Sequence, residues 1–412
     1  MKTTHVLALM CVVFLLSACS RPAQDTNIQW RNDRTGIFNE TGLLQSWPAD
    51  GPQLLWHTDG ILGEGHSSVA IDSDKIYVQG MIEGTGYLFV FDMNGNLLNK
   101  VEYGGEWVDS HRGSRATPTI NNGRIFVHTG LGELVCFDQN TLEILWRRNA
   151  ISEFGGRNVT HGVTESPLVV GNKVFLSAGG TEHNILALNV ADGSVIWSSP
   201  GMGDPPGYCS PIFIANQEVP QIVTTMGQHI LGLELTTGRV LWSYPFPSIR
   251  GINPNSPLYD GTSMILVSAG YERGSVMLRL TNGGRSVEKV WENDDLKSKH
   301  GGIVRIGDYV YMGGDARAMR FWHAVNWYTG EIAWRDNTFS PGTIIADGNG
   351  MLYFYSDRGD MALVRANPER FDLVSQFRIN LGTGQHWAHP VISNGVLYVR
   401  RGNTLMAFRI AP

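Results

Sequence analysis

Short apolar segments interrupted by polar residues recur along most of the chain. The segments "GRIFVHT", "NKVFLSA", "DYVYMGG" and "GVLYVRR" alternate at the period of a β-strand that buries one face. Turns such as "ADGS", "TTGR" and "YTGE" lie between strands, and an Asp or Thr before glycine is typical of a hairpin. The pattern predicts an all-β chain of short antiparallel strands.

A tryptophan marks five of the repeats of this pattern. Five tryptophans follow one another at spacings of 51, 45, 49 and 43 residues: Trp146, Trp197, Trp242, Trp291 and Trp334. A period near this length is typical of a propeller or a solenoid, and one unit of four short strands is one propeller blade. First strands open at eight places and therefore predict eight four-stranded blades: Ser68, Pro118, Pro167, Pro211, Pro257, Gly302, Pro341 and Pro390.

The two ends of the repeat region complement each other. The last repeat ends at "NTLMAFRI" without a tryptophan strand, whereas "QLLWHTDG" (residues 53–60) stands alone before the first blade. We predict that this early strand pairs with the final strand near Leu405, because closure of the ring removes an exposed sheet edge. The first blade departs from the repeat, since it has "NGNLLNKVEY" where a tryptophan is expected.

Composition agrees with a turn-rich β protein. The 412 residues are 42% hydrophobic and include 49 glycines, so the chain can bury a large core. Charged residues make up only 17%, and the formal net charge of −6 argues against a nucleic-acid partner.

The N-terminus has the pattern of a targeting segment. Lys2 precedes the apolar run "VLALMCVVFLL", which is too short to span a bilayer, and "LSAC" ends at Cys19. This ending resembles a bacterial lipobox, which implies that Cys19 is lipidated and anchors the chain to a membrane. By the habit of such lipoproteins, Ser20 favours the outer membrane, facing the periplasm; an ordinary signal peptide with an incidental cysteine is the alternative. We expect a signal peptide over residues 1–18, a tether and N-terminal segment over 19–49, and the propeller over 50–412.

Two cysteines remain in the predicted propeller. Cys136 and Cys209 lie 73 positions apart in different repeats, so their spacing alone does not decide whether they pair. We expect both to be unpaired, with Cys136 inside the apolar strand "ELVCFD".

The linkers between blades carry the candidate chemistry. In a propeller these linkers lie on one face, at the mouth of the central channel, so their polar side chains should converge there. The candidate catalytic residues are His161, Glu165 and His111. The candidate ligand-binding residues are His66, Arg112, Arg115, Arg157, Tyr208, Asn253, Asn255, Lys299, His300, His386, Trp387 and His389.

These residue types suit a polar, anionic ligand. Histidine carries protons near neutral pH, arginine binds carboxylate or sulfate, and tryptophan stacks on a sugar ring. The cations of three linkers would favour a uronate, a sulfated sugar or an organic acid, and the histidines would add charge at mildly acidic pH. Glu165 would orient His161, accept a ligand hydroxyl, or pair with Arg157.

Two other interpretations of the linkers stay open. Linkers are polar where they meet water, and some of these side chains would merely tie neighbouring blades together. A metal ion bound by His111, His161 and His300 is also conceivable, although no motif spacing supports it.

The tryptophan-and-glycine repeat over about residues 50–410 resembles the PQQ-like (quinoprotein-type) eight-bladed propeller family. That family includes the outer-membrane assembly lipoprotein BamB, polyvinyl-alcohol-dehydrogenase-like proteins and PQQ-dependent alcohol dehydrogenases. The resemblance implies the fold and leaves the function open. The quinone enzymes use a vicinal cysteine pair and an acidic calcium site, and no Cys-Cys occurs here, so PQQ and calcium are not expected.

Three functions follow from these observations. The first is an envelope lipoprotein whose channel mouth binds, with or without processing it, an anionic carbohydrate or other polar small molecule. The second is a BamB-like scaffold with an envelope protein partner, and the third is a degenerate PQQ oxidoreductase. The sequence leaves open whether the protein is an enzyme.

Overall fold

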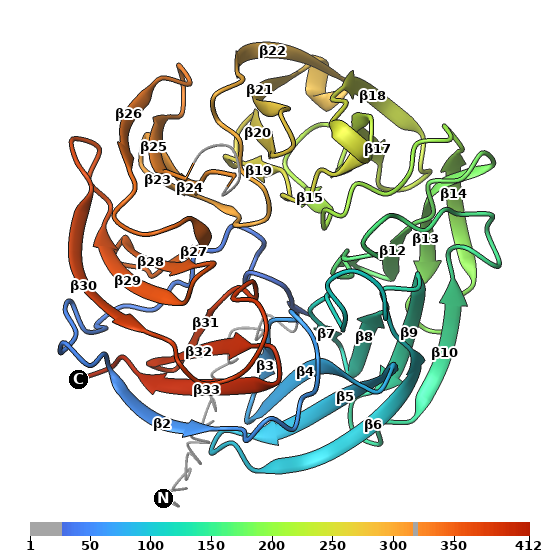
Figure 1. Cartoon of the computed structure of the whole chain (residues 1–412). Coiled ribbons are helices and arrows are strands. Elements are labelled where there is room, and N and C mark those ends of the chain that lie inside the picture. The colour runs from blue at the N-terminus through green and yellow to red at the C-terminus, as the bar shows by residue number, and fades with distance from the viewer. Residues whose placement is uncertain (1–26, 316–319) are drawn as a thin grey trace, which may run out of the picture.

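The computed structural model describes residues 27–315 and 320–412; the predicted signal peptide and Cys19 lie outside these ranges. Eight antiparallel sheets stand around a central axis like the blades of a propeller (Figure 1). The eight-bladed, all-β prediction is confirmed. Two short 3₁₀ turns, η1 (Ile249–Gly251) and η2 (Asn282–Gly284), are the helical segments of the described chain.

Each blade holds four strands, which run outward from the channel in chain order. Blades 1 to 4 are β3 (Ala70–Asp72), β4 (Lys75–Ile82), β5 (Thr85–Asp92), β6 (Leu97–Gly105); β7 (Thr119–Asn121), β8 (Arg124–His128), β9 (Glu133–Asp138), β10 (Ile144–Asn149); β11 (Val169–Val170), β12 (Lys173–Ser177), β13 (His183–Asn189), β14 (Val195–Pro200); and β15 (Ile212–Ile214), β16 (Gln221–Thr225), β17 (His229–Glu234), β18 (Val240–Pro245).

The remaining blades follow the same order, except that the outermost strand of blade 8 comes from the N-terminal side. Blades 5 to 8 are β19 (Leu258–Tyr259), β20 (Met264–Ala269), β21 (Gly274–Thr281), β22 (Ser286–Asn293); β23 (Ile303–Ile306), β24 (Tyr309–Gly313), β25 (Trp322–Asn326), β26 (Ile332–Asp336); β27 (Gly342–Ala346), β28 (Met351–Ser356), β29 (Asp360–Arg365), β30 (Asp372–Arg378); and β31 (Val391–Ser393), β32 (Val396–Arg401), β33 (Thr404–Arg409), β2 (Gln53–His57).

The predicted closure of the ring is confirmed. Strand β2 pairs antiparallel with β33, with Trp56 opposite Ala407 and Gln53 opposite Arg409. Strands from the two ends of the propeller therefore share one sheet, and β2 covers the edge that β33 would otherwise expose.

The repeated tryptophan joins several of the blades to the next one. Trp146 at the end of blade 2 donates its indole N–H to the carbonyl of Val190, in the β13–β14 turn of blade 3, at 3.2 Å. Equivalent bonds run from Trp197 to Leu235 and from Trp334 to Asn367. The indole rings are therefore buried between neighbouring blades, which explains why a tryptophan recurs in most repeats.

A β-bulge precedes each of these positions. The pairing of the outermost strand shifts register between Ile144 and Trp146 in blade 2, and all eight blades show the same shift. A bulge leaves its extra residue outside the regular ladder and bends the strand. The apolar residues before each tryptophan are thus turned toward the outer circumference.

The N-terminal segment crosses the central channel, which the sequence did not predict. Strand β1 (Asn27–Ile28) pairs with β7 of blade 2, and Ile37 bridges to Ala346 of blade 7. Between them, buried Arg31 donates to the carbonyls of Ile303 and Ile344 at 2.9 and 2.7 Å. Figure 1 shows this segment passing through the middle of the ring.

Candidate functional site at the channel mouth and on the rim

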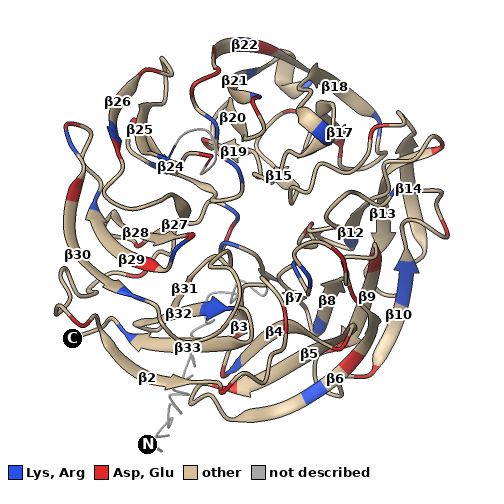
Figure 2. Ribbon diagram, viewed as in Figure 1, with Lys and Arg blue, Asp and Glu red and all other residues tan. Residues whose placement is uncertain are grey.

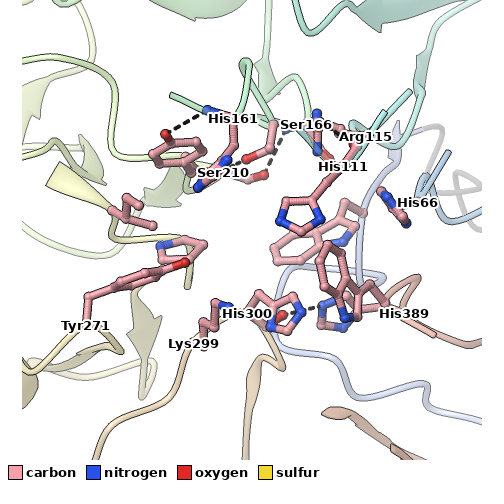
Figure 3. Close-up of a pocket in the computed structure, with 16 residues that line it drawn as sticks. His66, His111, Arg115, His161, Ser166, Ser210, Tyr271, Lys299, His300 and His389 are labelled. Atoms are coloured by element: carbon pink, nitrogen blue, oxygen red, sulfur yellow. Dashed lines mark hydrogen bonds between the residues drawn. The ribbon is translucent and has the colours of Figure 1, made fainter. Parts of the chain in front are cut away.

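The blade linkers converge on a pocket at the channel mouth. Its volume is about 160 Å³, close to the size of a cavity of about 150 Å³ that accepts a benzene ring. We call it the mouth pocket; it is lined by Trp30, His66, His111, Arg115, His161, Thr164, Ser166, Tyr208, Ser210, Ile252, Pro254, Tyr271, Lys299, His300, Trp387 and His389 (Figure 3).

The structure brings many, but not all, of the candidate residues together. On the pocket wall lie His66, His111, Arg115, His161, Tyr208, Lys299, His300, Trp387 and His389. Outside the wall lie Arg112, Arg157, Glu165, Asn253, Asn255 and His386.

The two asparagines outside the wall are ties between neighbouring segments. The buried amide of Asn253 donates to the carbonyl of Met226 at 2.7 Å, and that of Asn255 donates to the carbonyl of Ser298 at 2.8 Å. Such bonds satisfy linker carbonyls that no strand reaches. His386 has a similar role, because its ring hydrogen-bonds the buried Tyr355 hydroxyl at 2.7 Å.

The remaining candidates face away from the pocket. Arg112 pairs with Glu64 at 3.1 Å on the surface, and Arg157 is exposed. Glu165 is buried outside the pocket lining, where its carboxyl interacts with Ser177 and with the charge of Arg34 rather than with the expected His161 or Arg157. Burial, the main cause, raises the pKa of Glu165 to about 7.

Trp387 stands at the centre of the imidazole groups. The centroids of the His66, His111 and His300 rings lie 5.1, 4.7 and 5.0 Å from its ring. His111 in turn lies 5.4 Å from His161. Rings at these separations pack edge to face or tilted, so the side chains form one continuous wall.

Several of these histidines are neutral, contrary to expectation. Burial lowers the pKa of His300 to about 3 and holds those of His66 and His389 well below the usual value. Cationic neighbours add to each shift: Arg115 beside His66, Lys299 beside His300 and Arg31 beside His389. These three rings therefore do not add positive charge at mildly acidic pH.

The described residues do not fit a metal centre or a quinone–calcium site. Within 27–315 and 320–412, no group of three or more His, Cys, Asp or Glu side chains could hold a metal ion, so His111, His161 and His300 do not form one. Calcium needs about six to eight oxygen ligands, and no carboxylate lines the mouth pocket. Cys136 and Cys209 are both buried and unpaired, as expected.

Two aromatic residues of the pocket were not predicted. Trp30 belongs to the N-terminal segment, and its ring lies 5.1 Å from that of His389. Tyr271 comes from the β20–β21 turn rather than from a linker, with the Lys299 amine 5.3 Å from its ring centroid. No repeat or linker pattern covers either position, so the sequence offered no signal for them.

A second feature lies on the outer circumference of the ring. Paired aliphatic residues at the bulges of blades 8, 1, 2 and 3 are 36% to 46% exposed: Leu54, Leu55, Leu97, Leu98, Ile144, Leu145, Val195 and Ile196. We call this set the rim arc. It follows the neighbouring strands β2, β6, β10 and β14 in Figure 1, and Figure 2 shows charged residues of both signs along the outer strands.

A membrane-crossing helix is not found among the described residues, since none is long and apolar enough.

Fold, closure and linker site together define an eight-bladed propeller of the PQQ-like class. The family model described as outer membrane protein assembly factor BamB matches residues 40–336. The chain belongs to this family.

Individual relatives agree with this assignment. BamB of Burkholderia pseudomallei is 25% identical over 67% of this chain and 69% of its own length. BamB of Shewanella oneidensis is 27% identical over 43% of this chain, which spans only 44% of that protein. A polyvinylalcohol dehydrogenase of Pseudomonas is 23% identical over 45% of this chain and 30% of its own length.

Solved structures share the fold. BamB from Moraxella catarrhalis has a TM-score of 0.62 at 14% identity, covering 87% of this chain and 99% of that one. Quinohemoprotein alcohol dehydrogenase from Comamonas testosteroni has a TM-score of 0.65 at 12% identity, over 92% of this chain and 79% of that one. Identities this low carry the architecture and not the chemistry.

Proposed function

We propose that this protein is a BamB-like scaffold of the bacterial envelope, which binds a protein partner during outer-membrane protein assembly. The family match supports the class of function, and the rim arc supplies a surface for it. The names of the relatives concern outer-membrane assembly and alcohol oxidation. They give no support to the carbohydrate-binding hypothesis.

The rim arc is the observation that carries this proposal. Single exposed aliphatic residues are common on proteins, whereas exposed aliphatic pairs repeated on four neighbouring blades give a larger apolar surface, which marks an interaction site. In blade 4 the equivalent residues, Val240 and Leu241, are less exposed than those of blades 8 to 3. At these positions in blades 4 to 7, none of the described residues is an exposed large hydrophobic residue. The exposed aliphatic pairs therefore lie on one side of the ring, as a docking site for one partner requires.

Membrane attachment fits the same proposal. A lipidated Cys19 would hold the propeller at the outer membrane, facing the periplasm. Replacement of Cys19 by alanine should then release the protein into the aqueous phase on detergent extraction. Retention in the membrane fraction would require another anchor.

The test uses substitutions at matched bulge positions. Leu98→Glu and Leu145→Glu place a charge on the rim arc, whereas Ala333→Glu changes the corresponding exposed residue before Trp334 in blade 6. In a host lacking the gene, wild type and Ala333→Glu should restore the level of outer-membrane β-barrel proteins. The combined Leu98→Glu and Leu145→Glu variant should not, although its melting temperature is unchanged. Full restoration by that variant would overturn the rim as the docking surface.

A further inference from the structure

We propose that the mouth pocket binds one small organic carboxylate of about the size of a single ring. This goes beyond the scaffold function and does not depend on it, because the rim arc and the mouth pocket share no residue. Three features of the pocket carry the proposal: its charge, its unpartnered donors and its size.

The pocket wall carries cations and no carboxylate. Arg115 and Lys299 line it, and no Asp or Glu does. The charge of Glu106 acts on Arg115 and that of Asp315 on His300. Neither acid lines the pocket. Within a partly enclosed site such an arrangement attracts an anion from solvent.

Buried nitrogen atoms on the wall lack hydrogen-bond partners within the described chain. Both ring nitrogens of His66, Nε2 of His300 and Nε of Arg115 are in this state. An unsatisfied buried donor is unfavourable, and a neutral imidazole offers one donor and one acceptor. A carboxylate could accept from Arg115 and from an imidazole N–H, which would satisfy groups that the fold leaves open.

The remaining surface suits a flat apolar body. Trp387, Trp30 and Tyr271 line the pocket, and Figure 3 shows Tyr271 on the side of the pocket opposite His66. The cavity of about 160 Å³ accepts a single ring. A neighbouring depression shares Lys299 and His300 and includes Asp357, so an additional anionic group would not be favoured on that side.

The three features select the ligand class together. Charge and donors favour a carboxylate, and the ring-sized aromatic cavity favours a compact body. Benzoate is therefore the probe, and benzamide is its neutral partner of the same shape. Acetate with acetamide, and glucuronate with glucose, test a smaller body and a sugar.

The experiment is calorimetric titration of the purified protein with these pairs at low and high salt. We expect benzoate to bind at least ten-fold more tightly than benzamide, and the difference to shrink as added salt screens the charges. Benzoate should also bind more tightly than acetate or glucuronate.

Two arginines of the same linker distinguish binding in the pocket from binding at the surface. Arg115→Ala should weaken benzoate at least ten-fold, whereas Arg112→Ala should leave it unchanged, since Arg112 pairs with Glu64 outside the pocket. The guanidinium of Arg115 also donates to the carbonyls of Ser110 and His111. A second variant, His66→Phe, covers the case in which Arg115→Ala disturbs the linker, and it should lose benzoate while retaining or raising the melting temperature.

Three results would count against the proposed carboxylate site. Equal binding of benzoate and benzamide, no measurable binding of any carboxylate, or wild-type affinity in both Arg115→Ala and His66→Phe would overturn the proposal. The Leu98→Glu and Leu145→Glu variant should bind benzoate normally, so that failure of the scaffold proposal is seen separately.

Discussion

Trp146 lies directly over Gly193, the turn glycine of the next blade. A Cβ atom on Gly193 would come within 2.7 Å of the indole ring, and the glycine has a φ of +71°. Gly95 lies under Trp56 and Gly238 under Trp197 in the same way. The recurring glycine and the recurring tryptophan of the sequence are therefore the two halves of one contact between blades.

This contact predicts that Gly193→Ala destabilises the protein more than its backbone angle alone requires. Gly171→Ala is the control, because Gly171 has a φ of +59° with nothing within 4 Å of its added Cβ. The control should cost about 1–2 kcal/mol for the left-handed backbone, and Gly193→Ala about 1–3 kcal/mol more for overpacking. Denaturant unfolding of both variants gives the difference, and equal losses would contradict the role of the contact.

At the contact between blades 1 and 2, both the tryptophan and the glycine are replaced by other residues. Asn99 occupies its tryptophan position, and Leu142, buried with a φ of +59°, occupies the glycine position of the following turn. A leucine fits there because no indole covers the turn. We predict that Asn99→Trp and Leu142→Gly each destabilise the protein, while the double variant loses less than the sum.

The size of this coupling can be measured in a double-mutant cycle. Residues in contact usually couple by about 0.5–3 kcal/mol, and the sign here should favour the double variant. Strict additivity of the two free-energy changes would show that the positions are independent.

The sequence was sufficient for the ring but not for the channel. Each repeat encodes its own strands and turns, and most repeats a tryptophan; the orphan strand containing Trp56 predicted its pairing with β33. Residues 27–49 carry no repeat, so nothing indicated that Arg31 and Trp30 would lie in the channel. Linker composition located the mouth pocket, yet Asn253 and Arg115 look alike as polar linker residues. Only the folded backbone determines that Asn253 hydrogen-bonds to carbonyls whereas Arg115 lines the cavity.

From the hydrogen bonds of Arg31 we predict that the stability of the protein depends strongly on the N-terminal segment. Its guanidinium donates to carbonyls of blades 6 and 7 and lies 2.9 Å from Nδ1 of His389. Arg31→Met would leave buried acceptors unsatisfied and should cost about 2–4 kcal/mol in the free energy of unfolding. Gln45→Ala, an exposed change on the same segment, should cost no more than about 0.5 kcal/mol. Similar small losses in both variants would mean that the segment does not hold the ring together.

From the raised pKa of Glu165 we predict that the protein loses stability as the pH rises toward neutral. The carboxyl has an ordinary pKa of 4.5 and a folded pKa of about 7, so the folded state binds its proton more tightly than the unfolded state. The associated stability is fully present below pH 4.5 and is lost as pH rises to about 7, by about 3 kcal/mol. Glu165→Gln should remove this slope and be more stable than wild type at pH 8. The exposed Glu182→Gln should change nothing, and an unchanged slope in Glu165→Gln would exclude Glu165 as its source.

From the lowered pKa of His300 we predict a pH dependence of stability with the opposite sign, in which stability falls as the solution becomes acidic. Burial and neighbouring Lys299 lower its pKa from 6.5 to about 3, so the unfolded state binds the proton more tightly. The associated stability is complete above pH 6.5 and is lost as pH falls, by about 2 kcal/mol between pH 6.5 and 5. His300→Asn, which cannot be protonated in this range, should lose less stability than wild type over that interval, whereas the exposed His57→Asn should behave as wild type. Proton NMR offers an independent check, because the His300 ring should remain neutral in the folded protein at pH 5. A protonated His300 ring at pH 5 would contradict both the slope and the neutral imidazole wall of the mouth pocket.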